Sequence, residues 1–428
     1  MSSETNERGI KVYTSRPWEL IKTGFLVATW IVMGAHLALA APTLDILASQ
    51  TGVLYGGIST ILMARSIGYM FGNIVGALAQ EIVKKYSENL LSISFLIASI
   101  AVFATPAITN LYHLSTVFFF QGISQGWTDL GGTNSMLTMW GGNVAAPLNV
   151  VHLGYGLGSV FANLIVKPFL REDGNSTVSS VSSIIPVEIE KSNIQIPYSI
   201  VAVLCLLISI GHLLFGICEY RIRRKMARQN RSLNYSLVST TIANEAQKVE
   251  TKKVSQYSPR SCGNGYFNYG LTMTIVWILY MFCLSGNHYT FGNFFFTYVK
   301  SPEFAISTHG ATWFMIAYWL SYSVGRLICA VVIVFVPVHI ALSGLWVLGL
   351  ILAIGWYLFV WIISLTSTSL LVLGISTGLV FSPTFPLSFG FIKQRLNVNP
   401  LFIGVVLCSA SLGATFYQKL GGKSSSSL

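Results

Sequence analysis

Long apolar segments recur along this chain of 428 residues, and they limit its possible folds more than any other feature. Each segment has about 20 residues, which an α-helix needs in order to cross a hydrocarbon core of about 30 Å. Backbone polar groups in lipid must be satisfied within the protein, so only helices or a closed barrel can span it. Barrel strands would have about ten residues of alternating polarity, and the segments show no such alternation. We therefore predict an all-α membrane protein.

The composition supports this class and excludes others. Hydrophobic residues make up 53% of the chain and charged residues 10%, whereas a soluble domain carries about 25% charged residues. The net charge of +11 does not indicate nucleic-acid binding, because the positive residues gather mainly in one loop. The six cysteines form no CxxC pair, which favours packing roles over a disulfide framework or a metal site. No catalytic motif is present, so we expect neither an enzyme nor a resident cofactor.

The apolar segments predict eleven transmembrane helices, six before a polar gap and five after it. The first six cover 21–44, 53–79, 90–108, 113–139, 147–169 and 196–219. The last five cover 269–297, 309–332, 338–361, 368–391 and 400–418. The predicted organisation is an N-terminal half over 1–219, a basic cytoplasmic linker over 220–268 and a C-terminal half over 269–428.

The distribution of Lys and Arg predicts the orientation, because cytoplasmic loops are enriched in these residues. With a cytoplasmic N-terminus, 18 of the 26 Lys and Arg residues fall in inner segments and 6 in outer ones. The sequon at Asn175 then lies outside, where it is a candidate glycosylation site. The basic run at 221–225 either sets the topology or contacts anionic headgroups of the inner leaflet.

An internal repeat relates the two halves. The triplet Gly-Ala-His at 34–36 recurs as Gly-Asn-His at 286–288, which is 252 positions further on. The segment Gly-Ile-Ser-Gln-Gly at 122–126 recurs as Gly-Ile-Ser-Thr-Gly at 374–378, again 252 positions further on. Both matches join helices of equal rank in the two halves. Two identical offsets therefore predict two structurally related halves.

Two parallel six-helix halves joined by a long cytoplasmic loop are the layout of major facilitator transporters. Such a protein binds its substrate near the bilayer midplane between the halves and alternates by rocking one half against the other. The repeat places the partner of helix 196–219 about 252 positions further on, beyond Leu428. We therefore expect that the twelfth helix is missing, in a truncated product, a splice form or an eleven-span variant.

Asp129 is the acidic residue deepest within a predicted helix, about sixteen residues from the start of 113–139. Ionisable groups in a membrane mark ion pathways by default, and a carboxylate can hold either sodium or a proton. The alternative is a structural ion pair with Arg65 or Arg326, which lie within the second and eighth predicted helices. These arginines could instead hold a substrate hydroxyl. Asp45 ends the first helix and is either a second cation-coupling residue or a solvated acid.

Histidines, amides and aromatic residues within the helices predict a site for a neutral polyol. Amides bind sugar hydroxyls, and aromatic rings cover apolar sugar faces. His36 and His288 occupy equivalent positions of the repeat, which suggests paired roles at the cavity, although a buried histidine can also be a satisfied core residue. The predicted substrate-binding residues are His36, Gln121, Gln125, Trp127, Asn134, His152, Asn287, His288 and Asn293.

The fourth predicted helix and the segments after it carry a family resemblance. Gly-Trp-Thr-Asp-Leu-Gly-Gly at 126–132, Trp-Gly-Gly-Asn-Val-Ala-Ala-Pro at 140–147 and Val-His-Leu-Gly at 151–154 resemble the sodium-dependent glucose transporter group of the major facilitator superfamily. Ala-Pro-Thr-Leu-Asp at 41–45 resembles the related major facilitator superfamily domain-containing protein 4 group. The resemblance implies a multi-pass plasma-membrane protein that couples sodium entry to uptake of a glucose-like hexose.

Three functions remain open from the sequence. The first is a cation-coupled monosaccharide symporter, and the second is a proton-coupled or uncoupled carrier of another small polar solute. The third is a non-transporting membrane receptor or scaffold with the same fold. Saturable, cation-dependent uptake would separate the first two, and the absence of uptake by a normally expressed protein would favour the third.

Overall fold

The computed structural model describes residues 11–53, 55–170, 193–237, 255, 257–301, 303–304 and 306–425, and it defines the backbone alone for 55–58, 226–237 and 421–425. The secondary structure of these residues is helical. The α-helices are α1 (Lys11–Thr14), α2 (Pro17–Ala38), α3 (Ala40–Thr51), α4 (Tyr55–Leu78), α5 (Gln80–Lys85), α6 (Ser87–Ala104), α7 (Leu111–Trp140), α8 (Ala145–Val166), α9 (Gln195–Leu237), α10 (Pro259–Cys262), α11 (Phe267–Val299), α12 (Thr308–Phe335), α13 (Val338–Leu358), α14 (Ser367–Phe381), α15 (Thr384–Arg395) and α16 (Pro400–Ser425). Short 3-10 or π turns are η1 (Thr105–Ala107), η2 (Gly141–Asn143), η3 (Lys167–Phe169) and η4 (Phe359–Ile363).

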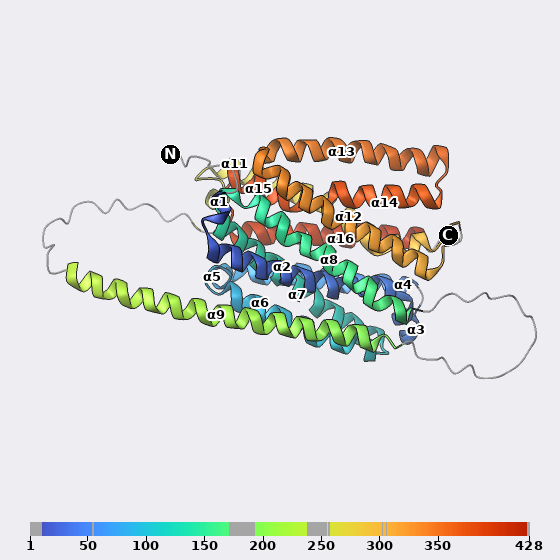
Figure 1. Ribbon diagram of the computed structural model, residues 1–428, viewed down its shortest axis with the longest axis horizontal. Helices are drawn as coiled ribbons and strands as arrows, with labels where there is room; N and C mark the ends of the chain where they lie inside the picture. Colours follow the sequence, from blue (N-terminus) through green and yellow to red (C-terminus); the bar gives the residue numbers. More distant parts are fainter. Residues whose placement is uncertain are drawn as a thin grey trace, which may run out of the picture.

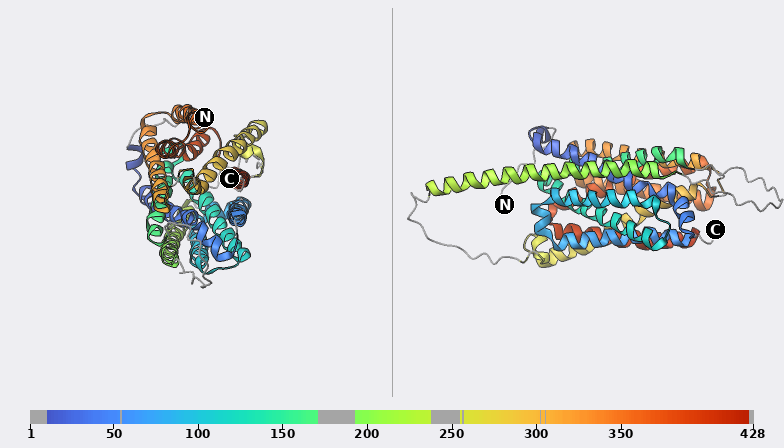
Figure 2. Two further views of the ribbon diagram at one scale, coloured as in Figure 1. Left: turned by 90° about the vertical axis from the view of Figure 1, so that its right-hand side faces the viewer. Right: turned by 90° about the horizontal axis from the view of Figure 1, so that it is seen from below.

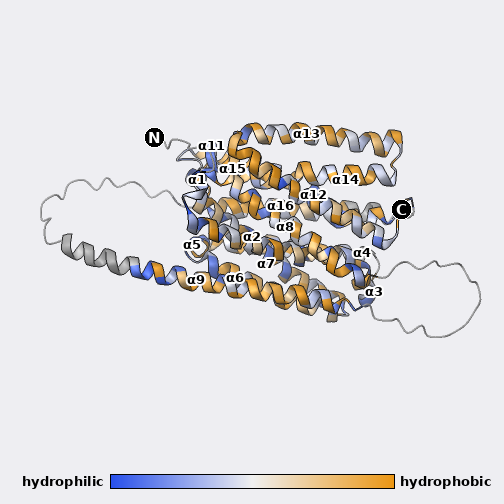
Figure 3. Ribbon diagram, viewed as in Figure 1, coloured by the Kyte–Doolittle hydropathy of each residue, from blue (hydrophilic) through white to orange (hydrophobic). Residues whose placement is uncertain are grey.

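The long helices run side by side along the longest axis of the molecule (Figure 1). Within the described residues, ten helical segments are long and apolar enough to cross a membrane. Hydrophobic residues predominate along these helices, as Figure 3 shows. The protein is therefore an all-α, multi-pass membrane protein.

Helix α7 is the one predicted span that is not among these ten segments. It covers the predicted span 113–139 in a single helix of 30 residues. Buried polar residues such as Gln121, Gln125, Asp129 and Asn134 make it less apolar than its neighbours. The count of eleven spans thus stays a prediction.

Two predicted spans are broken at proline residues. The first consists of α2 and α3, and the tenth consists of α14 and α15. Proline lacks an N–H group and clashes with the carbonyl group four residues before it. Pro42 in the first turn of α3 and Pro383 before α15 therefore explain both breaks.

Helix α9 is longer than the predicted span 196–219, because it continues to Leu237. It projects beyond one end of the bundle (Figure 1 and Figure 2). The chain from Ile217 to Leu237 contains neither proline nor glycine, so nothing stops the helix where the apolar segment ends. The beginning of the predicted linker is thus helical.

The end of the predicted linker packs against the protein. The amide N–H of Asn397 donates a hydrogen bond to the carbonyl oxygen of Cys262 (3.0 Å), and Asn264 donates one to that of Arg395 (3.2 Å). The Asn399 side chain donates to the Ser261 hydroxyl (3.2 Å). These bonds tie the end of the predicted linker to the loop between α15 and α16.

Glycine residues let equivalent helix pairs approach closely in each half. A Cβ atom added to Gly34 of α2 would overlap the Tyr155 carbonyl oxygen of α8, and one added to Gly158 would overlap that of Ile31. In the C-terminal half, a Cβ on Gly413 of α16 would overlap the Phe282 carbonyl oxygen of α11. Helices α2 and α8 therefore pack as closely as α11 and α16. Superposition of the halves about a pseudo-two-fold axis stays a prediction.

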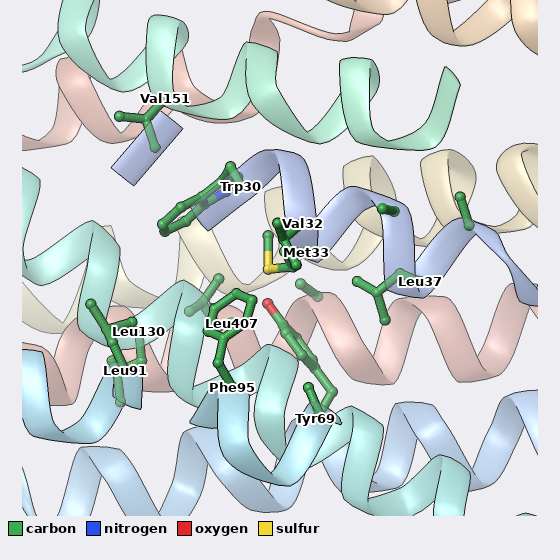
Figure 4. Packing of buried hydrophobic residues seen from close by; sticks show 14 of the residues in the cluster. Trp30, Val32, Met33, Leu37, Tyr69, Leu91, Phe95, Leu130, Val151 and Leu407 are labelled. Atoms are coloured by element: carbon green, nitrogen blue, oxygen red, sulfur yellow. The ribbon is translucent and has the colours of Figure 1, made fainter. Parts of the chain in front are cut away.

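The main apolar core joins both halves of the chain. Figure 4 shows Trp30, Met33, Phe95 and Leu130 together with Leu407, which lies on α16. Leu407 and Phe95 are fully buried.

A buried ion network lies beside this core, within the N-terminal half. The Lys22 ammonium group is 2.8 Å from a Glu88 oxygen and 2.5 Å from a Glu219 oxygen. The other Glu88 oxygen is 2.7 Å from Nδ1 of His212. This network joins α2, α6 and α9.

Candidate functional site

A cavity of about 430 Å³ lies between the helices, and both halves of the chain contribute to its wall. From the N-terminal half come residues of α2, α7 and α8, and from the C-terminal half residues of α11 to α16. The hydrogen-bonding or charged residues of the wall are Gln125, Asp129, His152, Tyr155, Ser285, Asn287, His288, Tyr289, Tyr318, Tyr322, Arg326, Thr377, Ser382, Thr384 and Tyr417. The apolar part of the wall includes Met33, Phe291, Trp346, Leu350, Phe381 and Phe385.

Asp129 lies in this wall because α7 carries polar residues four positions apart. Gln121, Gln125 and Asp129 share one face of the helix, since residues at i and i+4 point the same way. The Asp129 side chain is buried, with 5% of the residue exposed. The hydroxyl of Tyr69, on α4, donates a hydrogen bond to the Asp129 carboxylate. Figure 4 shows this hydroxyl directed toward Met33, another residue of the cavity wall.

Arg326 lines the same cavity from α12. Its Nε donates a hydrogen bond to the carbonyl oxygen of Ser382 (3.0 Å), at the break between α14 and α15. A second nitrogen donates to the carbonyl oxygen of His152 on α8, and the third donates to the Tyr322 hydroxyl (2.5 Å). Among the described residues, no ion pair joins Asp129 to Arg326 or Arg65. The hydrogen bonds of Arg326 go to neutral oxygens instead, and a structural role of Asp129 as the partner of Arg65 or Arg326 stays a prediction.

Two hydrogen bonds organise the polar part of the wall. The Gln125 amide of α7 donates to the Tyr289 hydroxyl of α11 (2.9 Å), which joins the two halves. His288 lies 3.2 Å from the Tyr322 hydroxyl and stacks on the Tyr322 ring, with centroids 5.1 Å apart. Asn287 precedes His288 and is exposed to the cavity.

A second, much smaller cavity of about 20 Å³ adjoins the first. The two cavities share Gln125, Tyr155, His288 and Tyr289 in their walls. The smaller one is also lined by Arg65 and Asn293, whose side chains are 3.4 Å apart (Arg65 nitrogen to Asn293 oxygen). Arg65 donates a further hydrogen bond to the carbonyl oxygen of Leu37 (3.2 Å).

The other predicted site residues line neither cavity. His36 packs against Phe95, with ring centroids 6.3 Å apart. Gln121 donates a hydrogen bond to Thr105 (3.0 Å). Asp45 is half-exposed and lies 3.7 Å from the Lys300 ammonium group.

Two more of these residues are on α7, and one lies outside the residues that the structure describes. Trp127 and Asn134 are absent from both walls. Asn175, the predicted glycosylation site, lies outside the described residues. Of the predicted site, the structure therefore gathers Gln125, Asp129, His152, Asn287, His288 and Arg326 around one cavity, with Arg65 and Asn293 beside it.

Three tyrosines of the wall were not predicted from the sequence. Tyr155 comes from α8 and is partly buried, and Tyr318 and Tyr322 come from α12 and are buried. Tyr318 and Tyr322 are four positions apart and precede Arg326 by eight and four positions, so they share its face of α12. That spacing was the available signal.

Comparison with known protein sequences finds relatives that are named as membrane transporters. The chain is 27% identical to sodium-dependent glucose transporter 1 of Rattus norvegicus over 172 residues, which are 39% of this chain and 35% of that protein. It is 24% identical to the Xenopus laevis protein of that name over 389 residues, 88% of this chain and 70% of that protein. Major facilitator superfamily domain-containing protein 4A of Mus musculus is 20% identical over 434 residues, 91% of this chain and 83% of that protein. No protein-family model matches the chain.

Solved structures agree in fold. The transporter FucP in its outward conformation superposes with a TM-score of 0.64 at 13% identity, over 95% of this chain and 92% of that one. A variant of the E. coli fucose:proton symporter FucP gives a TM-score of 0.58 at 15% identity, over 95% of this chain and 92% of that one. The nucleoside transporter NupG gives a TM-score of 0.56 at 15% identity, over 95% of this chain and 90% of that one. The chain therefore has the major facilitator fold. In sequence it is similar to sodium-dependent glucose transporter 1 and to major facilitator superfamily domain-containing protein 4A.

Proposed function

We propose that this protein is a secondary active transporter that moves a small polar solute together with a cation. One observation carries the proposal: both halves contribute to a single cavity of about 430 Å³ that holds the buried carboxylate of Asp129. A site between two halves is what alternating access requires, since rocking then exposes it to each side in turn. The halves are 1–219 and 269–428, joined by the segment 220–268.

The particular reaction that we propose is sodium-coupled uptake of a glucose-like monosaccharide across the plasma membrane. The similarity to proteins named sodium-dependent glucose transporter 1 supports sodium and glucose. The chemistry of the wall is compatible with both. Asp129 offers the oxygen ligand that a cation needs. Gln125, Asn287 and aromatic rings such as that of Phe385 offer amides and apolar faces to a sugar.

Proton-coupled transport is the second candidate. A buried carboxylate can carry a proton as well as hold sodium. One solved structure with this fold is a fucose:proton symporter, and another is a nucleoside transporter, which widens the range of polar solutes. A non-transporting receptor remains the third candidate.

The test is uptake of labelled glucose by proteoliposomes that contain the purified protein. One series has an inward sodium gradient at equal pH on both sides, and the other has a pH gradient without sodium. We expect saturable uptake that depends on sodium. Uptake that follows only the pH gradient would favour the proton-coupled reaction. Correctly folded protein that moves no polar solute under either gradient would contradict transport.

A further inference from the structure

Arg326 places a fixed positive charge in the wall of the main cavity. Only 2% of the residue is exposed, and a guanidinium group stays protonated inside proteins. Its three bonded acceptors are the carbonyl oxygens of His152 and Ser382 and the hydroxyl of Tyr322. All three acceptors are neutral. Two of the five N–H groups of the guanidinium have no acceptor within the part of the chain that the structure describes.

Within the described residues, no carboxylate oxygen lies within 4.0 Å of the Arg326 guanidinium, and Asp129 acts on it only from a greater distance. Burial of a charge costs several kcal/mol unless a partner of opposite charge compensates it. Asp129 faces the same cavity from the other half, but it forms no ion pair with Arg326. The three acceptors hold Arg326 in place. The Tyr322 ring also contributes, because its centroid is 4.1 Å from the guanidinium carbon. The cavity thus keeps its cation and its anion apart, on opposite halves.

A second guanidinium group makes the surroundings of the cavity more positive. Arg65 is buried, lines the adjoining small cavity and bonds only the neutral oxygens of Leu37 and Asn293 among the described residues. The walls of the two cavities therefore contain two guanidinium groups and one carboxylate. When a cation neutralises Asp129, both guanidinium groups remain uncompensated.

We propose that the site prefers a monosaccharide-like solute with one carboxylate, such as a sugar acid, to the neutral sugar, and that Arg326 binds this carboxylate while Asp129 holds the coupling cation. This inference rests on the proposed transport function and names the substrate class of that same site. A carboxylate is planar and matches the fork of a guanidinium group, which favours paired, charge-assisted hydrogen bonds. The remaining hydroxyl groups of a sugar acid would meet Gln125, Asn287 and His288. One cation and one carboxylate carried together make the transport step electroneutral.

The test uses matched pairs of compounds that differ only in a carboxylate: glucose and glucuronate, benzyl alcohol and benzoate, propanol and propionate. The first readout is the concentration of each compound that half-saturates thermal stabilisation of the purified protein. We expect one or more carboxylates to bind about tenfold tighter than the neutral partner, since a hydrogen-bonded charge contributes on that scale. The second readout is uptake of labelled glucose and glucuronate in proteoliposomes.

Variants of Arg326 assign the effect to this residue. Arg326→Gln should remove the preference for the carboxylate, and Arg326→Lys should retain part of it, because it keeps the charge without the fork. Arg224→Gln is the matched control, because Arg224 is exposed on α9. If Arg326→Gln does not fold, the preference for the carboxylate is compared between Arg326→Lys and the control. A preference that is unchanged in the variants that fold would overturn the assignment.

The outcomes separate this inference from the proposed function. Uptake of glucose, with no carboxylate favoured in any pair, would overturn the inference and leave transport in place. Stabilisation by chloride alone, equal to that by every carboxylate salt, would overturn it too, because the site would then take any small anion. No uptake of either labelled compound, from protein that no compound stabilises, would overturn both.

Discussion

At the residue scale, the cavity depends on a few side chains whose roles differ although their chemistry is alike. Asp129 and Asp45 were both predicted to couple a cation. The structure buries Asp129 in the cavity wall, where Tyr69 is its hydrogen-bond partner. It leaves Asp45 half-exposed near Lys300, away from both cavities. The two carboxylates therefore make a natural comparison.

Replacing Asp129 with asparagine should uncouple solute from cation. Asparagine keeps the size of the side chain and removes the charge that holds the cation. We expect gradient-driven accumulation to fall by about 5- to 150-fold, the usual range of coupling between two bound ligands. Exchange of labelled for unlabelled solute at equal cation concentrations should persist, because it needs no net cation transfer. Both rates are measured in proteoliposomes.

Asp45→Asn is the control for this prediction. Its carboxylate is partly solvated and, among the described residues, forms an ion pair with Lys300 at 3.7 Å, which contributes little. Proteoliposomes with Asp45→Asn should accumulate solute to within about twofold of the level reached with the parent protein. A larger loss in Asp45→Asn than in Asp129→Asn would reverse the assignment of the cation site.

Histidine shows why the site could be predicted only in part. His36 and His288 occupy the same position of the repeat, yet only His288 lines the cavity. Both helices are apolar on nearly all sides, so periodicity does not tell which face meets the other half. Polar residues spaced by four on α7 gave the stronger signal and led to Gln125 and Asp129. The tyrosines of α12 were missed because aromatic residues also face lipid in membrane helices.

At the element scale, helices were easier to predict than their ends and bends. The predicted span 113–139 matches α7 (Leu111–Trp140) closely. The helix begins after Asn110, whose backbone is extended, and ends before Gly141. The predicted span 368–391 is divided at Ser382 and Pro383. Helix α9 passes its predicted end by 18 residues, since its apolar part ends but its helical propensity does not. Hydropathy therefore predicts which residues lie in the membrane, whereas helix-breaking residues such as proline and glycine predict where a helix ends.

Close glycine contacts set the distance between α2 and α8. Gly158→Ala should destabilise the protein by about 1–3 kcal/mol, the usual cost of overpacking. The new methyl group would meet the carbonyl oxygen of Ile31 and force the two helices apart. Thermal unfolding of the detergent-solubilised protein measures the loss.

Gly24→Ala provides the matched comparison, because it makes the same change on α2. Apart from the neighbouring backbone of its own helix, no atom lies within 4 Å of a Cβ added at this position. Alanine stabilises a helix interior by about 0.5–1 kcal/mol relative to glycine. The two substitutions should therefore have opposite signs. Equal unfolding temperatures for both would mean that α2 and α8 can separate at no cost, against the packing described above.

At the scale of the whole molecule, charged contacts join the two halves at one end of the bundle. Lys300, which follows α11, lies 3.7 Å from Asp45 on α3. Lys167 of η3 lies 4.4 Å from the ring centroid of Trp313 on α12. Each contact pairs a residue of 1–219 with one of 269–428. Rocking of the halves would have to separate both.

A cross-link between positions 45 and 300 should therefore stop transport. The two residues become cysteines in a protein whose six native cysteines are replaced, and a bifunctional thiol reagent that is cleaved by reductant joins them. We expect uptake to be lost on cross-linking and restored by the reductant, because joined ends prevent the halves from parting. Each single cysteine variant, treated with the same reagent, should transport as before, since it cannot form the link. Full uptake by protein shown to be cross-linked would mean that the halves do not separate here, and alternating access would need another moving part.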